Sequence, residues 1–288
     1  MISCLMAAHN AAATITAAIE SVLAQTHPGL ELIVVDDGST DATAALAAAI
    51  PDPRIAVLRQ PRRGPSSARN LALSHARGVF VAAIDADDLW LPRKLELQLQ
   101  ALERNPAAAV AYGWTDFVDE HLRPLYPDER ATVEGNVHEA LLRLNFISCG
   151  SNTLIRRSAL QSAGGFDESL QAAEDWELHT RLAARHPFVA VPEVVVLYRR
   201  SSHSLSSRFW LMERNFLAAT RKIFAAAPPH SRPLEIQARA SFYRYLLLRA
   251  AESKGTRGKW KAIPRFAAIA AWYDPIGFVK ASWQVVSR

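Results

Sequence analysis

The sequence predicts an α/β fold, in which a mostly parallel sheet is flanked by helices and followed by a helical C-terminal extension. Apolar runs that resemble buried strands alternate four times with helical patterns over residues 1–105. These runs end in polar residues, and the ends of parallel strands are where open α/β sheets bind ligands. Of the 288 residues, 50% are apolar, which is enough for a large core.

The first half of the predicted fold consists of four strands and four helices. The strands are expected at residues 2–8, 30–35, 54–58 and 79–84, because each run is mostly apolar. After the first strand, apolar side chains recur on one helical face from Ile15 to Leu23, with Thr14 as the expected N-cap. An alanine-rich helix is expected to reach about Ile50, and a third helix to end near His75. Pro92 suits the first turn of the fourth.

The pattern changes after residue 107. Strands are expected at residues 110–114, 150–155 and 188–198, whereas residues 115–146 are less regular and richer in polar side chains. A turn at residues 164–168 leads into a helix from Ala173 to about Arg185, whose acidic first turn suits the helix dipole. Beyond residue 205, the sequence favours helices at 208–224 and 234–252, followed by short apolar segments at 263–273 and 276–283.

The strand expected at residues 79–84 runs directly into three carboxylates, Asp85, Asp87 and Asp88. In an extended backbone, side chains alternate, so Asp85 and Asp87 are expected to point to one side, with Ala86 facing the other. Two neighbouring carboxylates repel each other, and a hard divalent cation offsets that repulsion. We therefore expect Mn²⁺ or Mg²⁺ here and, through it, a diphosphate. A polar turn that only closes the strand is the alternative that these residues leave open.

The net charge of +5 is unevenly distributed along the chain. Residues 205–288 contain 15 Lys and Arg against 4 Asp and Glu, whereas the first 204 residues contain 18 against 24. A mildly acidic body with a basic tail suggests two functions and disfavours a nucleic-acid surface over the whole protein.

Cysteine usage and the missing glycine-rich motifs restrict the function classes further. Cys4 and Cys149 are isolated in apolar or small-residue surroundings, which excludes a zinc ribbon and a disulfide framework and fits a reducing cytoplasm. The chain starts with a strand-like run, so we expect no signal peptide, and no apolar run has the length of a membrane span. Neither a dinucleotide fingerprint nor a P-loop occurs, so phosphates are expected to be held by a metal and arginines.

A set of short motifs appears in an order that carries a family resemblance. The motifs are A-A-H-N (residues 7–10), S-V-L-A-Q-T (21–26), E-L-I-V-V-D-D-G-S-T-D (31–41), G-P-S-S-A-R-N (64–70), D-A-D-D-L-W-L-P-x-K-L (85–95), G-G-F-D-E (164–168) and E-D-W-E-L (174–178). With this set, the chain resembles a family 2 glycosyltransferase of the Rossmann-like GT-A fold. The resemblance covers roughly residues 1–200. It implies transfer of a sugar from a nucleotide sugar, most often a UDP-sugar, to a saccharide or lipid-linked acceptor.

The resemblance implies a nucleotide site built from several loops. The loop after the first strand would line the base, Asp37 would hydrogen-bond the base ring, and Arg69 would lie near the base or diphosphate. Asp85 would reach the ribose or the metal shell. The full set comprises Ala7, Ala8, His9, Asn10, Asp37, Arg69, Asp85 and Ala86.

The resemblance also implies the groups that perform the reaction. Asp87, with Asp85, would contact a Mn²⁺ or Mg²⁺ ion that bridges the diphosphate. Asp175 would be the general base that activates the acceptor hydroxyl, with Glu174 beside it. A single displacement would invert the anomeric centre, and bacterial surface polysaccharide synthesis is the expected setting.

Two positions depart from the family pattern. His9 replaces an aromatic residue, and a histidine at such a place is more often packed or hydrogen-bonded than a metal ligand. After the last core strand, many relatives have Y-R-x-H, whereas here His203 comes two positions later than that pattern requires.

We expect residues 1–204 to form the catalytic domain, with a nucleotide-sugar half at 1–105 and an acceptor half at 106–204. Residues 205–288 form a basic helical region with two alternative roles. It either caps the catalytic domain or contacts an anionic membrane surface, since basic residues beside Trp, Tyr and Phe suit a lipid interface. The second alternative implies a peripheral location on the inner face of the cell membrane.

Two competing functions remain open on the sequence alone. One is a non-catalytic module that binds a nucleotide sugar or glycan, against which the intact Asp85, Asp87 and Asp175 count. The other is a sugar-phosphate nucleotidyltransferase, which requires a Gly-rich basic loop where this chain has His9-Asn10-Ala11-Ala12.

Overall fold

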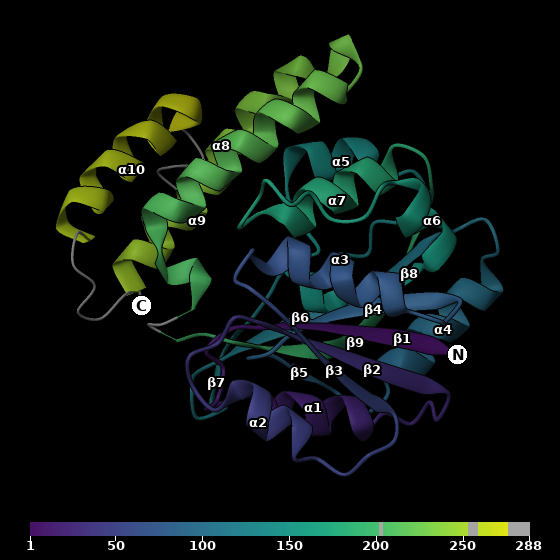
Figure 1. Cartoon of the computed structure of the whole chain (residues 1–288). Coiled ribbons are helices and arrows are strands. Elements are labelled where there is room, and N and C mark those ends of the chain that lie inside the picture. Colours follow the sequence, from purple (N-terminus) through teal and green to yellow (C-terminus); the bar gives the residue numbers. More distant parts are fainter. Residues whose placement is uncertain (202–203, 253–258, 276–288) are drawn as a thin grey trace.

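The computed structural model describes residues 1–201, 204–252 and 259–275, and it confirms the predicted α/β class (Figure 1). Its strands form one sheet in the order β3-β2-β1-β4-β8-β6-β9-β5, and β7 pairs with β6 outside this path. Helices cover both faces of the sheet, and the helices of the C-terminal region lie to the upper left of it (Figure 1).

The N-terminal half of the sheet is entirely parallel. Its strands are β1 (Ile2–Ala8), β2 (Leu30–Asp37), β3 (Ile55–Gln60) and β4 (Phe80–Asp85). Side chains of β1 alternate between two cores, with Cys4 and Met6 on one face and Leu5 on the other. Burial on both faces explains why β1 and β2 are almost continuously apolar.

The second half of the sheet mixes strand directions. β8 (Leu154–Arg156) runs antiparallel to both β4 and β6, whereas the long strands β6 (Val110–Val118) and β9 (Phe188–Arg199) are parallel. Two short strands, β5 (Leu89–Trp90) and β7 (Pro124–Pro127), pair antiparallel to β9 and β6. These long strands bring residues near 118 and 199 to the same edge of the sheet.

The two faces of the sheet carry different helices. One core contains side chains of α1 (Ile15–Leu23), α2 (Thr43–Ala48) and α4 (Lys94–Arg104). The other contains side chains of α3 (Pro65–His75), α5 (His138–Arg143), α6 (Arg157–Ser162) and α7 (Glu174–Ala183). In Figure 1, α1 and α2 lie below the sheet, and α3, α5 and α7 lie above it.

The C-terminal region is helical, as expected, and it packs on the side of the sheet that α5 and α7 cover. It contains α8 (Phe209–Ala226), α9 (Arg232–Glu252) and α10 (Lys259–Tyr273), and α10 packs against α8 and α9 (Figure 1). An apolar cluster joins α8 and α9 to Leu142, Leu170 and Trp176 of the preceding part of the chain. The expected segment at 276–283 and His203 lie outside the described residues.

The helices that the structure describes include none with both the length and the apolar character needed to cross a bilayer.

Four local predictions differ from the structure, each for a physical reason. The strand expected at 150–155 begins only at Leu154, because residues Gly150–Asn152 form a 3₁₀ turn. There the Asn152 amide takes the place of a strand neighbour, since its Oδ1 accepts the Gly113 N–H and its Nδ2 donates to the Gly113 carbonyl. Helix α2 stops at Ala48 rather than Ile50, since the residue before Pro51 disfavours helical geometry.

The other two differences concern Thr14 and Asp87. Thr14 holds the N-cap position of α1, but its hydroxyl donates to the Ala11 carbonyl and caps nothing. Strand β4 ends at Asp85, and the Asp88 N–H closes a turn on the Asp85 carbonyl. Strand alternation therefore does not govern where Asp87 points.

Candidate active site

A cavity of about 930 Å³ opens at the carboxyl ends of β1, β2 and β4. Strand order reverses here, because the chain leaves β1 toward β2 on one side and later pairs β4 on the other, and such switch points are where open α/β sheets bind ligands. All the side chains predicted for the site line this one cavity: Ala7, Ala8, His9, Asn10, Asp37, Arg69, Asp85, Ala86, Asp87, Glu174 and Asp175.

The loop after β1 is fixed by the loop after β2. His9 Nδ1 donates to the Asp37 carbonyl at 2.9 Å. Asn10 adopts a left-handed backbone (φ 50°), and its Oδ1 accepts the Thr40 N–H at 2.9 Å. The Ala11 N–H donates to Thr43 Oγ1 at 2.7 Å. The polar string at 36–43 therefore shapes the loop predicted to line the base.

Asp37 holds the entrance loop of α3 in place. Its buried carboxylate accepts the backbone N–H groups of Arg63 and Gly64, both at 2.8 Å, and Gln60 Nε2 at 2.7 Å. Oδ1 accepts two of these bonds and Oδ2 one, so Oδ2 retains acceptor capacity toward the cavity. The adjacent Gly38 has φ +67°, and a Cβ there would lie 2.8 Å from the Arg62 backbone nitrogen.

Arg69, on α3, joins two carboxylates from different elements. Its Nη2 lies 2.5 Å from Asp85 Oδ1 at the end of β4, and its Nη1 lies 2.6 Å from Glu174 Oε1 at the start of α7. Burial disfavours the guanidinium charge, but these two carboxylates hold the pKa of Arg69 above its ordinary value. The backbone of Gly150 passes close to both Arg69 and Asp175. A Cβ at this position would lie 3.7 Å from Arg69 Nη2 and 3.6 Å from Asp175 Cβ.

The three aspartates at the end of β4 and directly after it have different surroundings. Asp85 pairs with Arg69, while the buried Asp88 accepts the Ser151 hydroxyl at 2.6 Å and the Arg199 N–H at 3.1 Å. Asp87 lies in the cavity wall, and burial together with the charge of Asp85 raises its pKa to about 6. Burial, followed by the charge of Asp87, also raises the pKa of Asp88 well above its ordinary range.

The donor set fits a hard divalent cation. No group of three or more His, Cys, Asp or Glu side chains within the described ranges has metal-site geometry by itself, so a cation here would take further ligands from a diphosphate and water. Asp87 suits this arrangement, since the described residues give its carboxylate only its own backbone N–H as a donor. The carboxylates that gather here against Arg69 and Arg199 are Asp85, Asp87, Asp88, Glu174 and Asp175.

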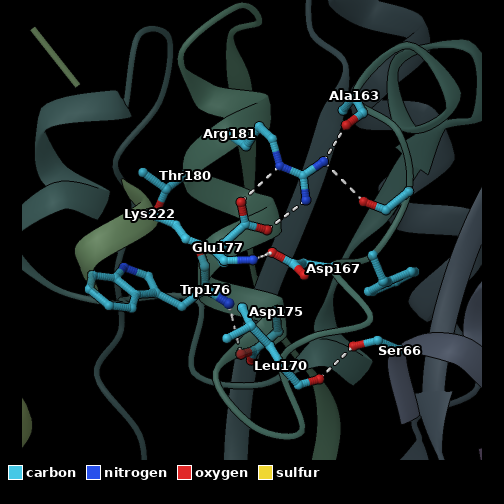
Figure 2. A network of polar contacts seen from close by, with 12 residues as sticks. Ser66, Ala163, Asp167, Leu170, Asp175, Trp176, Glu177, Thr180, Arg181 and Lys222 are labelled. Carbon is cyan, nitrogen blue, oxygen red and sulfur yellow. Dashed lines mark hydrogen bonds and ion pairs between the residues drawn. The ribbon is translucent and has the colours of Figure 1, made fainter. Parts of the chain in front are cut away.

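Asp175 lies in the first turn of α7, where it faces the cavity. One of its oxygens, Oδ1, accepts the Trp176 N–H at 2.7 Å (Figure 2). Burial, followed by the charge of Glu174, raises the pKa of Asp175 to about 7. Ala173, the residue before α7, has a left-handed φ of 59°, which is strained for a residue with a Cβ and which places the acidic turn at the cavity.

A polar network fixes the loop that leads into α7 (Figure 2). Arg181 binds Glu177 on its own helix and donates to the carbonyls of Ala163 and Gly165. Lys222 of α8 pairs with Asp167, and Ser66 of α3 donates to the Leu170 carbonyl at 3.0 Å. The loop at 163–173 is therefore tied to three helices, which makes the position of Asp175 depend on all of them.

The sequence motifs assign no role to three residues of the site. Arg199 lines the cavity, and its Nε donates to the Asp87 carbonyl at 2.9 Å. Asp88 and Ser151 are buried outside the cavity lining and bond to each other. The position of Arg199 directly after the last apolar run was the one signal that could have identified it. The cavity wall formed by α8 and α9 left no recognisable motif in the sequence.

Comparisons with known proteins identify the family of the chain. Residues 3–164 match the family model described as glycosyl transferase family 2. The succinoglycan biosynthesis protein ExoO of Rhizobium meliloti is 36% identical over 184 residues, which is 60% of this chain and 53% of that protein. WfgD of Escherichia coli, a UDP-Glc:alpha-D-GlcNAc-diphosphoundecaprenol beta-1,3-glucosyltransferase, is 42% identical over 106 residues, or 36% of this chain and 42% of that enzyme. The chain thus spans about half the length of these curated relatives.

Solved structures share the fold at low identity. Mannosyltransferase PcManGT from Pyrobaculum calidifontis, in complex with GDP-Man and Mn²⁺, superposes with a TM-score of 0.62 at 22% identity, over 99% of this chain and 78% of that one. S. aureus TarS 1-349, in complex with UDP-GlcNAc, gives 0.61 at 16% identity over 94% and 91%. The family match covers more than half of the sequence, and the fold and the relatives agree with it. The chain therefore belongs to glycosyl transferase family 2 and has a fold of the GT-A type.

Proposed function

We propose that the protein transfers a sugar from a nucleoside diphosphate sugar to a saccharide hydroxyl by a single inverting displacement. One observation carries this proposal: Asp87 and Asp175 line the same cavity. Arg69 connects the two sides, because it pairs with Asp85 near Asp87 and with Glu174 beside Asp175. A diphosphate held near Asp87 and an acceptor hydroxyl held near Asp175 would then face each other across the transferred sugar.

The nucleotide is proposed to lie over the carboxyl ends of β1 and β2. The loop at 7–10 would line the base, and Asp37 Oδ2 would accept a base N–H. Arg69 and Asp85 would lie near the diphosphate and ribose, beside Ala86. A UDP-sugar is favoured because WfgD is named for UDP-Glc and the TarS structure holds UDP-GlcNAc, although the PcManGT structure holds GDP-Man.

Asp87, with Asp85, would hold a Mn²⁺ or Mg²⁺ ion. When bound, such an ion stabilises negative charge on the departing diphosphate. The role of the chain is to keep the Asp87 carboxylate facing the cavity, which Arg199 Nε does by binding the Asp87 carbonyl at 2.9 Å. The Mn²⁺ in the PcManGT structure supports this part of the proposal.

Asp175 would act as the general base. As the acceptor oxygen bonds to the anomeric carbon, the bond from that carbon to the diphosphate oxygen breaks, and its electron pair leaves with the diphosphate. The hydroxyl proton moves to Asp175, whose pKa near 7 suits a base at neutral pH. Glu174 would support the base by its charge while it binds Arg69.

A product assay tests the proposal. The protein would be incubated with UDP-glucose, UDP-GlcNAc or GDP-mannose, with Mn²⁺ and with saccharide acceptors. We expect release of the nucleoside diphosphate and a glycoside of inverted configuration by NMR. Binding without release would identify the non-catalytic module, and pyrophosphate would identify the nucleotidyltransferase.

The setting is also a proposal, namely bacterial surface polysaccharide synthesis with a peripheral contact to anionic membrane. The names of ExoO and WfgD support the first part. On α10, Trp260 and Trp272 are 80% and 84% exposed, and Lys261 and Arg265 lie on the same exposed face. Salt-sensitive binding to anionic vesicles, reduced by Trp272→Ala, would support the contact, and its absence would count against it.

A further inference from the structure

The first turn of α7 borders two cavities. Asp175 lines the large cavity of the candidate site, and it also lines a second, inner cavity of about 10 Å³. On the side toward α8, the turn is held by Trp176, whose ring stacks on Phe216 with centroids 5.1 Å apart and planes within 8°. Trp176 is not among the residues that line the inner cavity. Other residues therefore decide what holds Asp175 on that side.

His179 lies one turn after Asp175 on α7 and lines the same inner cavity. Side chains at positions i and i+4 of a helix share a face and lie next to each other. His179 is 2% exposed, and within the described part of the chain its Nδ1 has no hydrogen-bond partner. A buried polar atom without a partner is costly, because it has given up its bonds to bulk water. A water molecule bound in the inner cavity would supply the partner.

The inner cavity has the size and the polar groups that one water molecule needs. A volume of about 10 Å³ is just enough for a single water. The lining includes His179, the Asp175 carboxylate and Gly150, which borders the cavity with backbone atoms. Asp175 Oδ1 accepts the Trp176 N–H, and a carboxylate has room for further donors. The other lining side chains are mostly apolar, so these few polar groups determine where the water lies.

The imidazole of His179 is arranged to donate to that water. Its Nε2 lies 3.5 Å from Thr153 Oγ1. Burial, followed by the charge of Arg69, lowers the pKa of His179 to about 3, so the ring is neutral near pH 7. When the Thr153 hydroxyl donates to Nε2, the ring proton is on Nδ1. Nδ1–H then donates to the water, and the water donates to Asp175.

We propose that the inner cavity holds one water molecule that joins His179 Nδ1–H to the Asp175 carboxylate, and that His179 is a positioning residue for the base. The water would orient the carboxylate and stabilise its charged form. The titratable groups that face Asp175 or His179 are Glu174 on α7, Arg69 on α3, Asp85 at the end of β4 and Cys149 before β8. This inference rests on the proposed function, because it concerns how Asp175 is held for that reaction.

Two substitutions of His179 separate positioning from packing. His179→Asn keeps an N–H donor one bond from Cγ, where Nδ1 is, whereas His179→Gln moves the donor one bond further, to the place of Nε2. We expect His179→Gln to lower kcat at pH 7 about tenfold while the affinity for UDP stays within about twofold. The rise of kcat/KM with pH should also move to higher pH, because the charged carboxylate loses a donor. His179→Asn should keep kcat and the pH profile close to those of the wild type.

Two measurements on the wild type do not depend on turnover or on the folding of a variant. In nitrogen-15 NMR spectra at pH 7, we expect the His179 ring to be neutral with its proton on Nδ1. In a high-resolution crystal structure, we expect a water within hydrogen-bond distance of both Nδ1 and the Asp175 carboxylate. A proton on Nε2, or an inner cavity without water, would overturn the inference.

His75→Gln is the matched control, because His75 is exposed at the end of α3 and lines neither cavity. It should leave kcat and the pH profile unchanged. An unshifted pH profile in His179→Gln, or equal losses in His179→Gln and His179→Asn, would mean that His179 only fills space. Absence of glycosyl transfer by the wild type would contradict the proposed function instead, and the NMR and crystallographic results would still decide whether the water is present.

Discussion

Asp88 accepts the backbone N–H of Arg199 at 3.1 Å, although 111 residues separate them in the chain. This bond attaches the end of β9 to the turn after β4. Within the acidic motif at residues 85–88, Asp88 therefore serves to hold the structure together. Asp87, one residue earlier, has its carboxylate in the cavity wall instead. Neighbouring aspartates therefore differ in role, and substitutions can separate those roles.

Asp88→Asn should destabilise the fold. Asp88 accepts hydrogen bonds from the Ser151 hydroxyl and the Arg199 N–H. An asparagine would place an NH₂ group, itself a donor, against one of them. The loss of that bond should lower the free energy of unfolding by about 1 to 3 kcal/mol. Urea denaturation at pH 7.5 measures this. If the substituted protein is as stable as the wild type, the bond to Arg199 is not needed.

Asp87→Asn should preserve stability and remove the response to metal. Its carboxylate is half-buried beside Asp85, so loss of the charge should leave the unfolding free energy equal or higher. In the wild type, Mn²⁺ with UDP should raise the melting temperature by mass action, and this rise should disappear in the variant. A retained Mn²⁺ response would place the cation elsewhere.

Asp175→Asn should lower kcat by about 10²- to 10⁴-fold while UDP affinity stays within twofold. An amide cannot accept the proton, but it leaves the donor end of the cavity intact. Asp52→Asn is the control, because Asp52 pairs with Arg54 just before β3 and does not line the cavity. Near-full turnover after the Asp175→Asn substitution would exclude Asp175 as the base.

The rate should depend on pH through Asp175. Its pKa of about 7 means that the base is protonated and inactive at low pH, so kcat/KM should rise as pH increases through about 7. After burial, the charge of Glu174 is the next cause that raises this pKa, so Glu174→Gln should move the rising limb to lower pH. A limb that stays in place would mean that another group titrates.

The same group should affect stability in the opposite sense. A carboxyl whose pKa is raised on folding favours the folded state at low pH, and that contribution is lost as pH rises from about 4 to about 7. Asp175→Asn remains neutral throughout, so its metal-free form should be more stable than the wild type at pH 8 and about equally stable at pH 4. Denaturation curves at both pH values measure the difference.

Arg69→Lys should weaken both stability and donor binding. One ammonium cannot reproduce the two ion pairs that the guanidinium makes with Asp85 and Glu174. We therefore expect the free energy of unfolding to fall by about 1 to 3 kcal/mol. Arg63→Lys is the matched control, because Arg63 pairs with Glu168 on the surface, where such a change costs under about 1 kcal/mol. Equal stability of the two variants would contradict the bridging role.

The parallel half of the fold was predictable because buried strands such as 2–8 and 30–35 are almost continuously apolar and are separated by helical patterns. The strand expected at 150–155 was wrong because Asn152 replaces backbone partners by its side chain, which composition cannot reveal. Asp85 and Asp87 do line one cavity, as predicted. The reason given for it, strand alternation, does not apply, because β4 ends at Asp85.

The candidate site was predictable where a motif marked it, and the structure gathers all those residues around one cavity. Their roles remain predictions. The contact between Asp88 and Arg199 depends on pairing between distant strands, and the wall of α8 and α9 depends on how helices pack on α7. Neither follows from local sequence, because both require the tertiary arrangement.

The stack of Trp176 on Phe216 has a consequence for protein engineering. Exchanging the C-terminal helices between relatives would separate a ring from its partner beside the reacting group, so a chimera joined near residue 204 should lose turnover even when both halves fold. A chimera that also exchanges α5 and α7 would take both rings of the stack from the same relative. We expect that chimera to remain active and to show the acceptor preference of the relative that supplied these helices.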